Sequence, residues 1–86
     1  MISCQQYDYI EIACLYKLPV KLCLADGSEI EGIAQDTVRH EDKQECMSLK
    51  TSAGLQIVVL DQLNTMEATR PNPHFERVHF TQTGQQ

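Results

Sequence analysis

Two aromatic and two acidic side chains crowd into five residues near the start of the chain: Tyr7, Asp8, Tyr9 and Glu11. Tyrosine is enriched at protein interfaces, and carboxylates match a basic partner. On a helix the same acids could instead cap the first turn, because Asp8 followed by Glu11 resembles a capping box and would contribute about 1 kcal/mol. Both interpretations stay open here, since a cap uses one oxygen and leaves the charge exposed.

The cysteines and histidines form no recognisable reactive pattern. No two cysteines make a C-x-x-C pair, and no spacing resembles a zinc site. His74 and His79, five residues apart, would face opposite sides of one strand. A pair of Cys46 with a histidine stays open, because such pairs are recognised by geometry. The sequence predicts no catalytic residues, no metal site and no cofactor, which argues against an enzyme.

A charged segment, residues 39–44, is the other candidate for function. It is polar, mixed in charge and long for a hairpin loop. Such a loop is usually a solvated turn, but loops on rigid β-scaffolds also carry binding residues.

A predicted helix positions the two tyrosines and two acids near the start of the chain. Ile10, Ala13, Cys14 and Lys17 recur at helical spacing and predict a helix over about residues 7–17. Pro19 should end it, because the residue before a proline is pushed away from the helical region.

Strands are predicted after the helix, over about 20–25, 30–38, 45–51, 55–60, 62–69 and 77–80. Gly32 predicts a bend or bulge. Residues 55–60 are almost wholly apolar, so we expect that strand to be central and buried on both faces. The pattern predicts a mainly β fold in one domain, residues 1–86, with an N-terminal helix on a small, strongly bent open barrel and a fraying tail at 81–86.

Charge narrows the class of partner. The formal net charge is -5, from 7 Lys and Arg against 12 Asp and Glu. This argues against a nucleic-acid ligand, because phosphate binding depends on basic side chains. No stretch has the ~20 apolar residues of a membrane span, and no signal peptide is recognisable. We therefore expect a cytoplasmic protein with reduced, buried cysteines: Cys4, Cys14, Cys23 and Cys46.

Three segments resemble one family. They are Tyr7-Asp8-x-Ile10-Glu11-x-Ala13-Cys14, then Leu22-x-Leu24-x-Asp26-Gly27, then the neighbourhood of Asp36. Over about residues 4–69 they resemble the Rof family, small bacterial proteins that bind Rho and inhibit Rho-dependent transcription termination. The segment from Leu22 to Gly32 is shared with Sm-like barrels generally. Gln5 and Gln6 stand where the family tends to have acids.

The resemblance implies an Sm-like barrel or sandwich with an N-terminal helix packed on it. It also implies docking on the N-terminal RNA-binding domain of hexameric Rho, in competition with RNA and without binding RNA. It assigns partner contacts to the helix and to the charged loop: Gln6, Tyr7, Asp8, Glu11, His40, Glu41, Asp42 and Lys43. A monomer is expected when free. The alternative is an Sm-like, ring-forming RNA-binding module, which would need a basic or aromatic pore.

Overall fold

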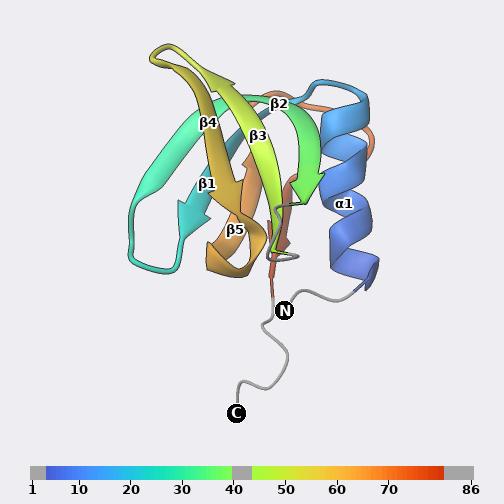
Figure 1. Cartoon of the computed structure of the whole chain (residues 1–86). Coiled ribbons are helices and arrows are strands. Elements are labelled where there is room, and N and C mark those ends of the chain that lie inside the picture. The colour runs from blue at the N-terminus through green and yellow to red at the C-terminus, as the bar shows by residue number, and fades with distance from the viewer. Residues whose placement is uncertain (1–3, 40–43, 81–86) are drawn as a thin grey trace.

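The computed structural model describes residues 4–39 and 44–80, which form one helix followed by an antiparallel sheet (Figure 1). The strands lie in the order β4-β3-β2-β1-β5-β6. The predicted mainly β fold with an N-terminal helix is confirmed, and the predicted tail at 81–86 lies outside the described residues. The elements are α1 (Cys4–Leu15), β1 (Pro19–Leu24), β2 (Glu29–Arg39), β3 (Glu45–Thr51), β4 (Gly54–Val59), the 3-10 turn η1 (Leu60–Gln62), β5 (Leu63–Ala68) and β6 (Arg77–His79).

Helix α1 begins at Cys4 and ends at Leu15, so both predicted ends were wrong. The end is set before Pro19 by a Schellman motif. Lys17 has a φ of 51°, its N–H donates to the Cys14 carbonyl at 3.2 Å, and the Leu18 N–H donates to the Ala13 carbonyl at 2.9 Å. Ile10, Ala13 and Cys14 are buried as predicted, whereas Lys17 lies past the helix and is exposed.

The sheet bends strongly along β2, as Figure 1 shows. A Cβ added to Gly32 would lie 2.5 Å from the Lys50 carbonyl oxygen, so only glycine lets β2 approach β3 this closely. The register of β2 against β3 shifts between Ala34 and Asp36. The Ser48 hydroxyl accepts a hydrogen bond from the Asp36 N–H there, at 3.1 Å. The predicted bulge therefore lies just after Gly32.

Strand β4 corrects a second expectation. It is the last strand on one side of the sheet, not a central one, and Leu55 and Ile57 are 65% and 47% exposed. The chain leaves β4 through η1, and β5 then pairs with β1. The apolar pattern indicated two faces to bury, but it could not specify which strands would lie alongside.

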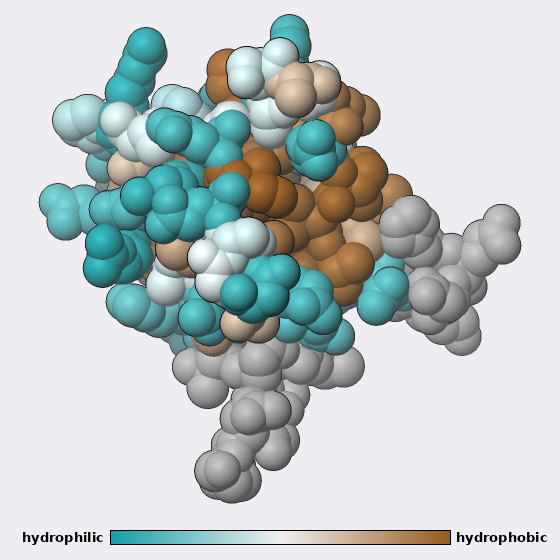
Figure 2. Space-filling model, turned by 90° about the vertical axis from the view of Figure 1, so that its left-hand side faces the viewer, coloured by the Kyte–Doolittle hydropathy of each residue, from teal (hydrophilic) through white to brown (hydrophobic). Residues whose placement is uncertain are grey.

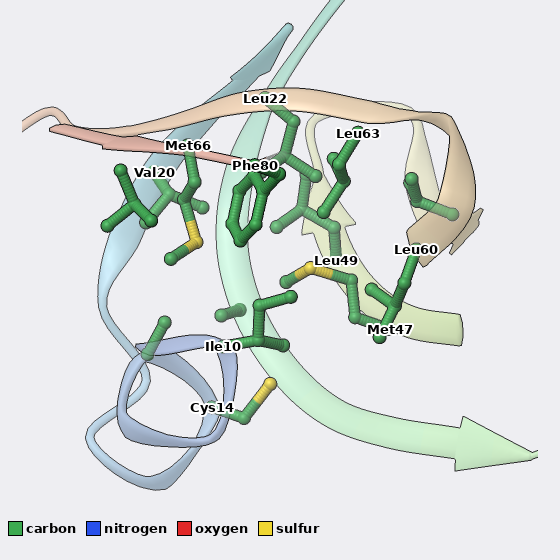
Figure 3. Packing of buried hydrophobic residues seen from close by; sticks show 14 of the residues in the cluster. Ile10, Cys14, Val20, Leu22, Met47, Leu49, Leu60, Leu63, Met66 and Phe80 are labelled. Atoms are coloured by element: carbon green, nitrogen blue, oxygen red, sulfur yellow. The ribbon is translucent and has the colours of Figure 1, made fainter. Parts of the chain in front are cut away.

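The core lies between the bent sheet and α1. Figure 3 shows Ile10 and Cys14 pointing from α1 toward side chains of the strands. Aromatic contacts join one flank of the helix to the segment before β6. The rings of Tyr9 and Phe75 meet edge-on with their centroids 6.1 Å apart, and the rings of Tyr16 and His74 stack with their centroids 4.7 Å apart. These contacts fix one flank of α1 against the segment before β6.

Candidate protein-binding site

The outward face of α1 carries a stripe of four side chains. Asp8, Glu11, Ile12 and Leu15 recur at i, i+3, i+4 and i+7, which places them on one side of the helix, away from the core. Asp8, Glu11 and Leu15 are exposed and Ile12 is half-buried. The stripe therefore combines two carboxylates with two aliphatic side chains.

This stripe forms one wall of a surface groove, and β2 forms the other. Asp36 and Thr37 of β2 line the groove together with the stripe, Cys14 and Lys17. Three carboxylates, those of Asp8, Glu11 and Asp36, thus line the groove together with the aliphatic side chains of Ile12 and Leu15. Lys17 is the single basic lining residue among them, and its amino group donates to the Gln35 carbonyl at 2.8 Å. We call this feature the acidic groove.

The capping interpretation of Asp8 and Glu11 was wrong. Because α1 begins at Cys4, its first turn contains no acidic residue. Asp8 and Glu11 lie in the helix interior, where the backbone N–H groups already have partners within the helix. Their exposed carboxylates are thus free of the structural role that the sequence offered as an alternative to recognition.

The other helix residues predicted to contact a partner are divided between two flanks. Tyr7 is half-buried and packs against the core cluster, one turn from Glu11. Gln6 lies on the flank that faces β6, where its side-chain amide donates to the His79 carbonyl at 2.9 Å. The structure therefore brings Asp8 and Glu11 into the groove, sets Tyr7 beside it, and does not bring Gln6 to it.

The charged-loop candidates, His40, Glu41, Asp42 and Lys43, lie outside the described residues. The strand ends that flank them are described: Arg39 pairs with Glu45 in the β2–β3 ladder. Since Asp36 and Thr37 line the acidic groove, the same strand leads from the groove to the start of this loop.

Six groove residues were not among the predicted contacts; they are Ile12, Cys14, Leu15, Lys17, Asp36 and Thr37. The helical spacing of Asp8, Glu11, Ile12 and Leu15 is a sequence signal that could have identified Ile12 and Leu15. The neighbourhood of Asp36 belonged to the family resemblance, but no spacing linked Asp36 to the helix, because only the packing of α1 against β2 brings the two together.

Cys14, Cys23 and Cys46 have free thiols, and the environments of these thiols differ. Cys14 and Cys46 are buried as predicted, whereas Cys23 is only half-buried, with its Sγ 3.5 Å from a Glu29 carboxylate oxygen. Burial raises the pKa of Cys14 to about 11; the Asp36 charge adds to this effect and Lys17 opposes it. Cys14 therefore stays protonated at neutral pH and is a poor nucleophile there.

Two kinds of feature are not found in the part of the chain that the structure describes. Among residues 4–39 and 44–80, no three His, Cys, Asp or Glu side chains are grouped so as to hold a metal ion. No helix in those same ranges is long and apolar enough to cross a membrane.

The fold and the groove together define a class: a small β-barrel or sandwich covered by one helix, with its acidic groove along that helix. The family model "Modulator of Rho-dependent transcription termination (ROF)" matches residues 1–80. The chain belongs to the Rof family. The predicted resemblance is thereby confirmed, and the family is described as a regulatory one.

A solved structure agrees with this assignment. The chain is similar to "YaeO bound to Magnesium from Vibrio cholerae O395", with 47% sequence identity and a TM-score of 0.83. The match covers 87% of this chain and 97% of that one. No curated protein matches the chain.

Proposed function

We propose that this chain binds the N-terminal RNA-binding domain of Rho and blocks its primary RNA-binding site, and that the acidic groove is the docking surface. The observation that carries the proposal is that Asp8, Glu11 and Asp36 line one groove together with the aliphatic side chains of Ile12 and Leu15. The family description supports a role in Rho-dependent termination.

Electrostatics favours Rho itself over RNA as the ligand. A site that binds RNA phosphates must be basic, and carboxylates can occupy the field that such a site creates. The chain has 12 acidic side chains against 7 basic ones, so its own attraction for RNA is weak. Because Rho acts in the bacterial cytoplasm, the proposal requires the chain to act there too.

The aliphatic side chains of Ile12 and Leu15 give the groove an apolar contact surface in addition to its charge. Apolar contacts at the centre of an interface exclude water and strengthen the surrounding charged contacts. We infer that Ile12 and Leu15 meet an apolar part of the Rho surface while the three carboxylates meet basic side chains around it.

The direct experiment titrates purified chain against Rho and a fluorescent pyrimidine-rich RNA. We expect saturating chain to displace the RNA. Glu11→Lys should weaken binding to Rho about tenfold or more, because the reversed charge is repelled by the basic site. Its melting temperature should stay near that of the unchanged chain, since Glu11 is exposed.

The matched control is Glu31→Lys, the same change at an exposed acid of β2 that lies near the β1–β2 turn and does not line the groove. It should bind Rho nearly as well as the unchanged chain. If RNA stays bound to Rho at saturating chain, or if both lysine variants lose affinity equally, the proposal is wrong.

A further inference from the structure

The outer face of strands β2, β3 and β4 carries aliphatic side chains that the rest of the fold leaves exposed. Ile33, Val38, Leu55 and Ile57 are 41%, 37%, 65% and 47% exposed. Single aliphatic residues are common on protein surfaces, but a contiguous group of them marks an interaction site. We call these four residues the aliphatic face.

Strand pairing makes the aliphatic face contiguous. Paired residues of neighbouring strands point to the same side of the sheet. Three rows result, each read from β2 through β3 to β4: Ile33-Lys50-Leu55, Asp36-Ser48-Ile57 and Val38-Cys46-Val59. Ser48 and Cys46 are buried in the middle strand, and Lys50 is the single basic side chain in these rows. Figure 2 shows a continuous hydrophobic area on this side of the molecule.

The second of these rows joins the aliphatic face to the acidic groove. Asp36 lines the groove, and Ile57 lies at the other end of its row, two strand spacings or roughly 10 Å away. A partner that fills the groove and reaches across β2 therefore meets carboxylates first and a mainly aliphatic surface beside them.

A site for single-stranded, pyrimidine-rich RNA offers the two matching kinds of surface. Such sites combine basic side chains along the phosphate backbone with aromatic side chains on which the bases stack. Carboxylates complement the basic part. Aliphatic side chains complement the aromatic part, because both apolar surfaces leave water when they meet. The acidic groove by itself accounts mainly for the first of these two contacts.

We propose that the aliphatic face covers the base-stacking part of the RNA-binding site of Rho, while the acidic groove occupies the part that binds phosphates. This inference rests on the proposed binding to Rho and adds a second, apolar contact to it. The chain thereby replaces RNA in two respects: carboxylates take the place of phosphates, and aliphatic side chains take the place of bases.

Titration of Ile57→Ser against Rho tests the apolar contact. The variant should bind about fivefold more weakly or worse, because the interface loses a buried aliphatic side chain. It should keep the full salt dependence of the unchanged chain, since it removes no charge. The matched control is Gln56→Ser, which shortens the neighbouring exposed side chain of β4 on the opposite face and should bind as the unchanged chain does.

Amide hydrogen exchange supplies a readout that needs no variant. Residues 54–59 should exchange more slowly in the complex with Rho than in the free chain, because the aliphatic face is covered there. The turn between β1 and β2, residues 25–28, belongs to neither surface and should exchange at the same rate in both states.

The outcomes separate this inference from the proposed function. If saturating chain leaves RNA on Rho, the proposed function fails, and this inference fails with it. If the chain displaces RNA and Glu11→Lys weakens it, but Ile57→Ser binds as tightly as Gln56→Ser, only the aliphatic contact is wrong. Circular dichroism checks that both serine variants are folded. If Ile57→Ser is unfolded, hydrogen exchange decides, and equal rates for residues 54–59 with and without Rho overturn the inference.

Hydrogen exchange also tests a different occupant. Exchange of residues 54–59 that slows as the concentration of the chain itself rises, without Rho, would assign the aliphatic face to a second copy and would overturn the proposal.

Discussion

Cys14 shows how one residue reports on both the core and the acidic groove. Its side chain belongs to the buried cluster, while its position also lines the groove beside Asp36 and Lys17. Burial and the Asp36 charge both disfavour the thiolate, and their combined effect exceeds the attraction of Lys17. The thiol thus acts as a small apolar side chain that supports the exposed stripe of α1.

The raised pKa of Cys14 predicts a loss of stability at alkaline pH. The pKa is 9.0 for an ordinary thiol and about 11 in the folded chain, so between these values the unfolded state releases a proton that the folded state retains. The stabilising contribution is complete below pH 9.0 and is lost as the pH rises toward 11, by up to about 2–3 kcal/mol. Thermal melts from pH 8 to 11 measure it.

Cys14→Ala is the control for these melts. It removes this ionisation and leaves the other titrating groups in place. The unchanged chain should therefore lose more melting temperature over the alkaline range than the variant does. Parallel pH profiles for the two proteins would show that Cys14 is not buried as described.

Helix α1 has two faces with separate tasks, and a matched pair of isoleucines distinguishes them. Ile10 is fully buried in the core, whereas Ile12 is half-buried along the acidic groove. Ile10→Ala should cost about 2–4 kcal/mol of unfolding free energy, because it leaves a cavity. Ile12→Ala should cost clearly less and should instead weaken binding to Rho.

Urea denaturation and Rho titration of both variants test this division. Binding must be compared at a temperature where Ile10→Ala is still folded. Equal losses of stability for the two variants would contradict the orientation of α1. Unchanged Rho affinity in Ile12→Ala would mean that Ile12 is not part of the proposed docking surface.

The charge of the whole molecule leads to a prediction about salt. An acidic chain with net charge -5 that docks on a basic site gains affinity from long-range attraction. Salt screens this attraction, and at 0.1 M the Debye length is about 10 Å. Affinity for Rho should therefore fall steadily as the salt concentration rises. Glu11→Lys should show a shallower salt dependence, because it contributes less attraction, while Ile12→Ala should keep the full slope.

Titrations at several sodium chloride concentrations give these slopes. A salt-independent affinity would mean that the carboxylates of the groove do not meet a basic surface.

Much of the molecule could be predicted from local sequence. Helical spacing correctly identified Ile10, Ala13 and Cys14 as the buried stripe of α1, and the strand segments agree closely with β1, β2, β3, β5 and β6. The turn at Asp26-Gly27 between β1 and β2 is also a local feature: Gly27 has a φ of 90°, and the Asp26 carboxylate accepts hydrogen bonds from the Ser28 N–H and hydroxyl. These features depend on neighbours within a few residues, which sequence patterns describe directly.

The ends of α1 were beyond such patterns. An acid pair suggested a start near Asp8, but the helix continues back to Cys4, and this removes the capping role. At the other end, Lys17 adopts the left-handed conformation that glycine usually takes. Leu18 packs against the core next to that turn, and no local sequence preference predicted the turn.

By itself, the sequence determined the acidic charge, the helix with its two faces, the strands and the resemblance to the Rof family. Only the tertiary structure decided that Asp36 completes the acidic groove and that Gln6 is drawn toward β6. It also placed β4 at an edge of the sheet. The reason is physical: periodicity specifies which face of an element is apolar, whereas contacts between elements far apart in the chain specify what that face meets.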